Sequence, residues 1–437
     1  MDKTGNVTKM PKVLIISYFF PPLSGPGVQR SYNFVRNLPD NGWEPVVLTV
    51  KDISYVARDE NLLTKLTGTE IIRTETVDPM RILYLWDKLW GNKQEDSIYV
   101  QASESVRSFG RDIFPIDSKI GWLLTAFREA CKLCRLNKIE VILATMSPYT
   151  SGILAYMVSK KMSLPYILDY RDLWQGKPDI KYFSRFHQHL AEKWEARIIR
   201  AAKAIIHVTE WSKERFLEIY PECERDKVSV IYNGYDREII PAEIPAIMTE
   251  GTIRFTYAGH FYGGQKPDIF IDSIRELIAE GNLPEGVVFE FIGNFPKSIE
   301  ELFFEHECIK RIQYLNYGDY IKKIIDSTVL LLFISSENSR MILTQKLFEY
   351  LAVRRPILAM IPVDGEAAAI INKYQAGLVK DGTSKADIKA GILEICGMIR
   401  KGEMTERLNV ANNDYSGFER QAQAKQLAEI MDNVTDG

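Results

Sequence analysis

The sequence predicts an α/β protein built from two domains, each a parallel sheet with helices packed against it. Its 437 residues are too many for one ordinary hydrophobic core and suit two domains of roughly 200 residues. Short apolar runs of about four to eight residues alternate with helix-like segments, the pattern of buried parallel strands and their crossover helices. Glycine-rich or polar loops follow several of these runs, where ligands bind in open α/β sheets.

The composition narrows the class of protein. A hydrophobic content of 46% and a charged content of 26% are typical of soluble globular chains. The net charge of −3 argues against a nucleic-acid partner. Five cysteines, an odd number, do not suit a disulfide framework and favour a reducing compartment.

The N-terminal residues and the longest apolar runs indicate where in the cell the protein is expected. MDKTGNVTKMPK is polar and leads directly into VLIISYFF, which is not the layout of a signal peptide. No apolar run approaches the ~18 residues of a membrane span. We therefore expect a cytoplasmic protein and leave open a peripheral contact with the inner face of the cell membrane.

The most informative stretch is TVLLLFISSENSRMILTQKLFEYLAVRRPILAMI, Thr328–Ile361. It predicts a buried strand over Val329–Ile334, a helix over about Thr344–Arg354, and a second parallel strand after Pro356. In such a unit the helix begins at the carboxyl ends of the strands, where its free N–H groups and dipole favour an anion.

Two charged residues near the start of this helix suit a nucleotide ligand. Lys346 and Glu349 are three residues apart and share one helical face. They offer a cation for phosphate and a carboxylate for sugar hydroxyls. Thr344 is a plausible N-cap, while Leu347 can face the sheet. The alternative is an ordinary solvated ion pair.

A second candidate ligand loop lies near the N-terminus. The strand beginning at Lys12 is followed by PPLSGPGVQR, in which Gly25 and Gly27 permit close approach of a ligand before a helix that starts near Val28. Arg30 occupies the third glycine position of the dinucleotide fingerprint, so a nicotinamide dehydrogenase is disfavoured. A Pro/Gly-rich turn without a ligand is the alternative.

The remaining elements complete two α/β series. Further strands are expected at Trp43–Val50, Val141–Ala144, Tyr166–Asp169, Ala204–Val208, Val228–Tyr232, Arg254–Ala258, Val287–Ile292 and Ile312–Leu315. Further helices are expected at Lys181–Lys203, Asp268–Glu280, Gly365–Ile371 and Tyr415–Met431. We place the domain boundary just after the Asn-Gly pair of VIYNGYD. The N-terminal domain is then 1–235 together with a terminal helix of about 415–437, and the C-terminal domain is 236–414.

Three further segments have two interpretations each. RILYLWDKLW, Arg81–Trp90, is either an interfacial amphipathic element or part of the core. DYRDLW, Asp169–Trp174, places two acids and an arginine at the end of a strand, for ligand binding or to fasten a loop. The helix near Lys181–Lys203 carries an excess of positive charge, which suits anionic lipid or simply a solvated face. Cys131 and Cys134 form a C-x-x-C. They lie in a helical pattern and no second pair follows, which disfavours zinc or redox chemistry.

The ordered series SYFFPPLSGPGVQR, DYRDLW, VTEW, VIYNGYD, YAGHFY and QKLFEYLAVRRPILA resembles the sequence blocks of bacterial glycosyltransferases of family four. The resemblance covers nearly the whole chain except residues 51–120. It implies the GT-B fold: two Rossmann-like domains facing each other across a cleft, with a C-terminal helix that crosses back to the N-terminal domain. It also implies a retaining enzyme without a metal cofactor, acting on a nucleotide sugar.

The resemblance implies a role for each candidate site residue. Glu349 matches the acid that binds the ribose hydroxyls, and Ile342, Leu343 and Thr344 match the loop at the diphosphate. The other donor-site candidates are Gly259, Lys266 near the phosphates, Gly293 and Tyr317 near the base, Lys346 and Leu347, and the N-terminal loop glycines Gly25 and Gly27. Asp172 lies in the region that faces the acceptor and the reacting sugar. Asp172 and Glu349 are the catalytic candidates.

Two positions depart from the family pattern. The family commonly has a second acid eight residues before the ribose-binding one, and Met341 stands there. That acid usually handles the donor sugar, and Glu337 is four residues too early to replace it. His260 follows Gly259 where many relatives have an arginine.

The chemistry of the leaving group supports the metal-free route. Negative charge develops on the departing nucleoside diphosphate, and proteins stabilise it with a metal or with cations and helix dipoles. The sequence has no D-x-D, and it supplies Lys266, Lys346 and glycine-rich helix starts. We expect a UDP- or GDP-sugar donor and a saccharide acceptor linked to lipid, in surface polysaccharide biosynthesis. A nucleotide-binding partner of another transferase and a sugar-nucleotide epimerase are the alternatives.

Overall fold

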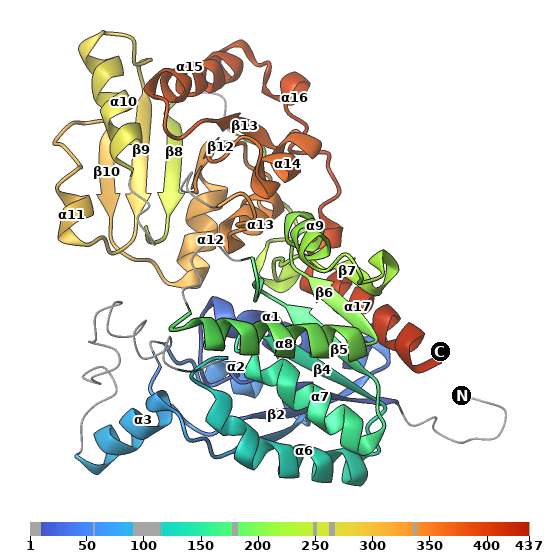
Figure 1. Ribbon diagram of the computed structural model, residues 1–437. Coiled ribbons are helices and arrows are strands. Elements are labelled where there is room, and N and C mark those ends of the chain that lie inside the picture. The colour runs from blue at the N-terminus through green and yellow to red at the C-terminus, as the bar shows by residue number, and fades with distance from the viewer. Residues whose placement is uncertain are drawn as a thin grey trace. The chain divides into compact units, whose positions relative to one another are not determined.

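The computed structural model describes residues 10–55, 57–90, 114, 116–176, 182–247, 251–261, 267–334 and 339–436. The chain divides into two compact units (Figure 1). The first comprises Met1–Tyr232 and Arg420–Gly437, and the second comprises Asn233–Glu419. Two parallel sheets, one in each unit, confirm the predicted α/β fold class.

The described part of the first unit contains a seven-stranded parallel sheet in the order β3-β2-β1-β4-β5-β6-β7. Its strands are β1 Lys12–Ile16, β2 Glu44–Val50, β3 Glu70–Thr74, β4 Val141–Met146, β5 Tyr166–Tyr170, β6 Ala204–His207 and β7 Val228–Val230. The central strands are buried on both faces, which explains their continuous apolar runs. The direction of winding reverses between β1 and β4, the place where such sheets bind ligands.

Helices cover both faces of this sheet. They are α1 Pro26–Asn37, α2 Asn61–Thr64, α3 Pro79–Leu89, α6 Leu123–Asn137, α7 Thr150–Met162, α8 Arg185–Ala201, α9 Glu210–Ile219 and α17 Arg420–Asp436. One core cluster joins alternate residues of β1, such as Val13 and Ile15, to α1 and to Leu427 and Met431 of α17. The terminal helix therefore belongs to the first unit, as the resemblance implied. It begins at Arg420, after a 3₁₀ turn over Ser416–Phe418, and not at Tyr415.

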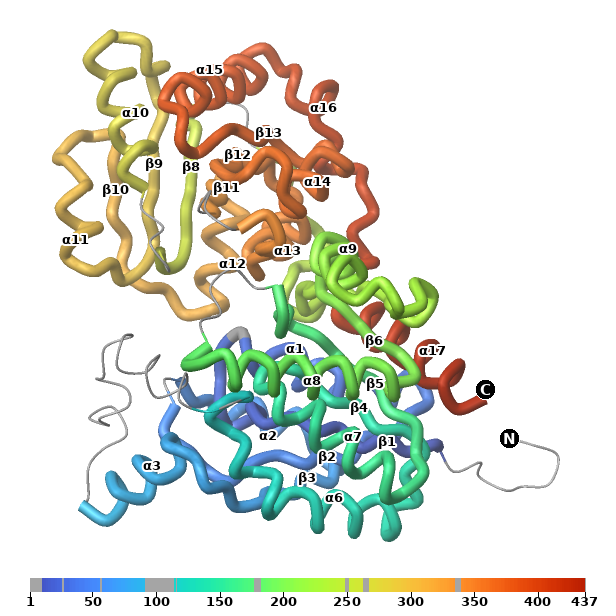
Figure 2. The backbone as a smooth tube through the Cα atoms, viewed as in Figure 1, coloured from blue at the N-terminus to red at the C-terminus, as the bar shows by residue number. Residues whose placement is uncertain are grey.

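The described part of the second unit contains a six-stranded parallel sheet in the order β10-β9-β8-β11-β12-β13. Its strands are β8 Ile253–Ala258, β9 Val287–Ile292, β10 Ile309–Ile312, β11 Val329–Phe333, β12 Ile357–Met360 and β13 Gly377–Lys380. Its helices are α10 Asp268–Ala279, α11 Lys297–Glu300, α12 Tyr317–Ile325, α13 Gln345–Ala352, α14 Glu366–Lys373, α15 Lys385–Lys401 and α16 Met404–Arg407. Figure 2 follows the same chain as a tube. Here winding reverses between β8 and β11.

One predicted strand lies at a different position in the structure, and two strands were not predicted. The strand predicted at Ile312–Leu315 is β10, Ile309–Ile312. It is an edge strand with two exposed residues in its middle, so no apolar run marks it. Strands β3 and β13 escaped prediction, and both are edge strands that are only partly buried.

The structure also bears on the C-x-x-C pair and on the prediction that no segment spans a membrane. Cys131 and Cys134 lie buried in α6 without a disulfide, and burial raises the pKa of the Cys134 thiol to about 12. Both thiols therefore pack in the interior of the first unit. Among the described residues, none of the helices is both long and apolar enough to cross a bilayer.

Candidate active site

Glu349 lies buried near the start of α13 and holds two tyrosine hydroxyls. The Tyr317 hydroxyl donates to Glu349 Oε1 at 3.0 Å, and the Tyr320 hydroxyl donates to Oε2 at 2.6 Å. Glu349 is only 5% exposed, so the alternative of an ordinary solvated ion pair is wrong. Burial, followed by the nearby Glu349 carboxylate, raises the pKa of Tyr320 well above its usual value, which keeps its hydroxyl a donor.

Lys346 turns away from solvent onto an aromatic ring. Its Nζ lies 2.9 Å from the Tyr257 hydroxyl and 4.4 Å from the centroid of the same ring. Burial lowers the pKa of Lys346 to about 8, while the neighbouring Glu349 acts in the opposite direction. The site therefore holds an under-solvated cation that an anionic ligand would stabilise.

Two glycines at the carboxyl ends of β8 and β9 leave room for this arrangement. Gly259 has φ +130°, and a Cβ there would lie 2.5 Å from Lys346 Cε. Gly293 has φ +151°, and a Cβ there would lie 2.5 Å from the Gly259 carbonyl oxygen. Because only glycine combines these conformations with such close approach, both positions require it.

The loop before α13 is placed as the helix pattern predicts. Thr344 occupies the N-cap position, but no cap hydrogen bond forms, and its inaccessible Oγ1 has no partner among the described residues. Ile342 is exposed and Leu343 is half-buried, whereas the Leu347 side chain is fully buried in the core. Leu347 can therefore serve a donor only indirectly, by fixing the helix.

Two residues weighed for the donor site lie outside the described part of the chain. Lys266 falls within residues 262–266 and Glu337 within residues 335–338, which the structure does not describe. Met341, where the family commonly has an acid, is half-buried, and His260 Nδ1 lies 3.0 Å from the Asn294 carbonyl oxygen.

In the first unit the loop at Gly25 and Gly27 is fastened by the DYRDLW segment. Arg171 donates a hydrogen bond to the Gly27 carbonyl oxygen. A Cβ at Gly27 would lie 3.2 Å from the Arg171 guanidinium. Gly25 has φ +108° and stands at the N-cap position of α1. The glycines thus serve this loop geometry, whether or not a ligand is bound.

Arg30 and Asp169 form a buried ion pair in this unit. Arg30 Nε lies 3.0 Å from both carboxylate oxygens, and Nη2 lies 2.8 Å from Oδ1. The side chains are 3% and 0% exposed. Arg30, which breaks the dinucleotide fingerprint, therefore ties α1 to the end of β5. Of the two interpretations of DYRDLW, ligand binding or fastening of a loop, the second therefore holds for Asp169.

Asp172 is exposed next to a packed pair of aromatic rings. Tyr149 and Trp174 stack with centroids 4.6 Å apart and planes 3° apart, and the Tyr149 hydroxyl donates to the Leu173 carbonyl oxygen at 2.8 Å. A cavity of about 350 Å³ adjoins this segment and is lined by Trp174, Gln175, Gly176, Tyr182, Ser184, Arg185 and Gln188. Aromatic, amide and guanidinium groups together suit a sugar.

A buried acid stands behind this cavity. Glu195 accepts from the Tyr170 hydroxyl and the Gln175 backbone N–H, each at 3.1 Å. Burial raises the pKa of Glu195 to about 8, although these hydrogen bonds and one from Tyr220 lower it. The carboxyl is thus largely protonated at neutral pH and fixes the backbone at the cavity wall.

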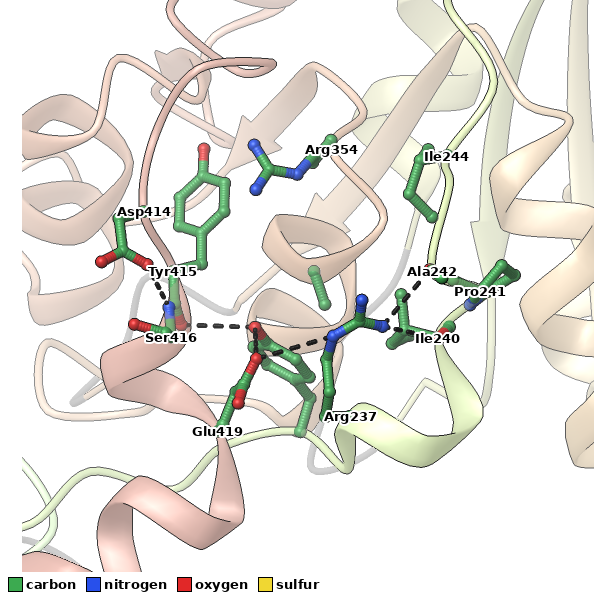
Figure 3. A pocket seen from close by; sticks show the side chains of 12 residues that line it. Arg237, Ile240, Pro241, Ala242, Ile244, Arg354, Asp414, Tyr415, Ser416 and Glu419 are labelled. Atoms are coloured by element: carbon green, nitrogen blue, oxygen red, sulfur yellow. Dashed lines mark hydrogen bonds and ion pairs between the residues drawn. The ribbon is translucent and has the colours of Figure 1, made fainter.

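A smaller cavity of about 120 Å³ lies within the second unit, and none of its lining residues is a candidate donor residue (Figure 3). Arg237 points at Glu419, 3.7 Å away, and donates to the Ile240 carbonyl oxygen at 2.7 Å. Arg354 lies over the Tyr415 ring. Both guanidinium groups are thus already engaged by the protein.

Among the described residues, His, Cys, Asp and Glu form no group of three or more that would hold a metal ion. Metal independence itself stays a prediction, because it concerns the reaction. Three further residues of these sites were not predicted from the sequence: Tyr320, Tyr257 and Glu195. Tyr320 had a usable signal, since it follows Tyr317 by three residues on one helical face. Tyr257 and Glu195 had none, because their roles come from tertiary contacts.

Comparison with known proteins agrees with this fold. A glycosyltransferase from Rickettsia africae matches at a TM-score of 0.64 and 13% identity, covering 97% of this chain and 98% of the other. HepE of Anabaena, solved in complex with UDP and glucose, matches at 0.60 and 13%, covering 97% and 100%. A putative UDP-N-acetylglucosamine 2-epimerase from Listeria monocytogenes matches at 0.54 and 12%, covering 96% and 95%. No curated protein matches in sequence.

The molecule therefore has the GT-B fold of glycosyltransferases. Residues 27–239 match the family model described as Glycosyltransferase Family 4. The resemblance predicted from the sequence is thus confirmed over this part of the chain, which includes most of the first unit.

Proposed function

We propose that the protein transfers a sugar from a nucleotide-sugar donor to an acceptor hydroxyl, with retention of anomeric configuration. The observation that carries this proposal is the buried Glu349 beside the under-solvated Lys346 at the carboxyl edge of a parallel sheet. A carboxylate that already organises two tyrosine hydroxyls can accept from ribose hydroxyls, while the lysine neutralises a diphosphate. The UDP and glucose held by HepE favour a UDP-sugar over a GDP-sugar.

The proposed roles divide between the units. In the second unit, Gly259, Gly293, Tyr317 and the Ile342–Thr344 loop would form the donor site around Lys346 and Glu349. In the first unit, Asp172 and the cavity beside Trp174 would face the acceptor. We take that acceptor to be a lipid-linked saccharide at the inner face of the cell membrane, as in surface polysaccharide assembly.

The test is thermal stability against UDP, GDP, ADP and their sugars, with and without magnesium. A ligand at 100 times its Kd stabilises the folded state by about 2.7 kcal/mol, so the melting temperature rises with the correct nucleotide. We expect one nucleotide to act, equally with and without the metal. Transfer to an acceptor analogue should then give a product of retained configuration by NMR. An inverted product would contradict the retaining mechanism.

Two alternatives keep the fold. A nucleotide-binding partner of another transferase is suggested by Met341, and it would bind nucleotide without transferring sugar. An epimerase, as in the putative Listeria neighbour, would convert the sugar nucleotide to its epimer with no acceptor present. Following the sugar nucleotide and its products by NMR with and without acceptor separates the three.

Nucleotide affinity should fall as pH rises above about 8. The free Lys346 has a pKa of about 8, and a bound diphosphate favours its charged form, so binding takes up a proton in this range. If only the protonated lysine binds, Kd at one pH unit above this pKa is about tenfold weaker than at neutral pH. Calorimetric titration at a series of pH values measures it. Lys346→Arg, which stays charged, should remove the dependence, and a wild-type Kd that is flat through pH 9 would contradict the assignment.

A further inference from the structure

Helix α3 buries two of its charged residues and exposes several of its large apolar ones. Its buried residues are Met80, Arg81 and Asp87. An apolar stripe follows helical spacing on the opposite side and is exposed to solvent: Ile82 57%, Leu85 43%, Trp86 52%, Leu89 83% and Trp90 70%. The core interpretation of this sequence stripe is therefore wrong.

Polar contacts fix this orientation. Asp78 caps the helix by accepting from the Met80 and Arg81 backbone N–H groups at 2.9 and 3.2 Å. The Arg81 guanidinium binds the Glu75 carboxylate with two hydrogen bonds of 2.9 and 3.0 Å. Rotating α3 to bury the stripe would break these contacts.

The apolar surface extends beyond α3. Val77, just before the helix, is 62% exposed, and Leu124, at the start of α6, is 72% exposed. Contacts join the two regions: the Trp122 Nε1–H donates to Thr74 Oγ1 at 2.7 Å, and Thr125 donates to the Glu75 carbonyl oxygen. The stripe, Val77 and Leu124 together are called here the α3 surface.

Basic side chains accompany the α3 surface. Exposed Lys88 lies on α3 itself, and exposed Arg128 and Arg135 lie on α6. These three have no recorded ion pair in the described part of the chain. The acids nearby, Glu75 and Glu129, are paired with basic residues. Helices α3 and α6 run along the same border of the first unit, with α3 projecting beyond the sheet (Figures 1 and 2).

We propose that the α3 surface docks the protein on a bilayer that contains anionic lipid, with α3 lying in the head-group region. Two features favour a bilayer over a protein partner. Trp86 and Trp90 lie together, with ring centroids 5.8 Å apart, and tryptophan is the residue that bilayer interfaces prefer. The exposed cations on α3 and α6, which pair with none of the described residues, suit anionic head groups. The inference rests on the proposed function in one respect: a lipid-linked acceptor explains why the protein would dock on a membrane. The observations on α3 do not depend on that acceptor.

Vesicle sedimentation tests the proposal. The full chain is mixed with vesicles of phosphatidylcholine alone or with phosphatidylglycerol added, at low and high salt. We expect binding to the anionic vesicles and a blue shift of tryptophan fluorescence. The triple variant Leu85→Ser, Trp86→Ser, Leu89→Ser should partition at least tenfold less. Arg128→Glu with Arg135→Glu should lose binding chiefly at low salt, since salt screens that contribution.

The control is Tyr314→Ser with Val363→Ser, which removes apolar side chains of similar exposure from the second unit and should bind as wild type does. Wild type that ignores anionic vesicles, or a triple variant that binds unchanged, would overturn the proposal. So would self-association that the triple variant abolishes, because a second copy would then be the occupant. Transfer to a water-soluble acceptor should be equal in wild type and triple variant, so failure of docking and failure of the proposed function are separate results.

Discussion

Glu349→Gln should lower sugar transfer by about 100-fold while the protein remains folded. Glutamine keeps the shape of the side chain but loses the charge, and its amide nitrogen cannot accept from a tyrosine or a ribose hydroxyl. Hydrogen bonds to charged groups contribute about 1.5–3 kcal/mol each, so losing one or two accounts for this drop. Initial rates over a range of donor concentrations measure it.

The matched control is Glu290→Gln in β9. Glu290 is a similarly buried acid with two partners, Lys323 Nζ at 2.8 Å and Thr256 Oγ1 at 3.2 Å, but it was not assigned to the donor site. It should lose stability and keep its transfer rate per folded molecule. Equal transfer by wild type and Glu349→Gln would remove Glu349 from the donor site.

Arg30→Met should destabilise the first unit by about 3–5 kcal/mol, because it leaves the fully buried Asp169 carboxylate without its counter-charge. The double variant Arg30→Met, Asp169→Leu should recover much of this loss, since it replaces the whole pair by apolar side chains and leaves neither of its charges behind. Urea unfolding followed by tryptophan fluorescence measures the effect. All seven tryptophans lie in the first unit, so the signal reports on that unit alone.

Arg225→Met is the control for this experiment. Arg225 makes an equally close two-pronged pair with Glu214, at 2.5 and 2.7 Å, but the pair is exposed. Exposed pairs contribute about 0–1 kcal/mol, so its unfolding midpoint should barely move. Similar losses from Arg30→Met and Arg225→Met would contradict the importance of burial.

The sequence alone determined the fold class. Central parallel strands are buried on both faces, so they consist of continuous runs of apolar residues. Strands β1, β4, β5, β9 and β11 were predicted within a few residues for this reason. Edge strands β3, β10 and β13 were missed or shifted, since partial burial places no such demand on their residues. The placement of Lys346 and Glu349 on one face of a single helix was likewise visible, because helical spacing is local.

Only the tertiary structure decided what these residues touch. It showed that Tyr317 and Tyr320 hold Glu349, that Tyr257 shields Lys346, and that Arg30 binds Asp169 across 139 positions of sequence. It also showed that α3 buries its polar face. Sequence periodicity reports that a helix has two faces, but which of them meets the protein depends on the partners that packing brings to it.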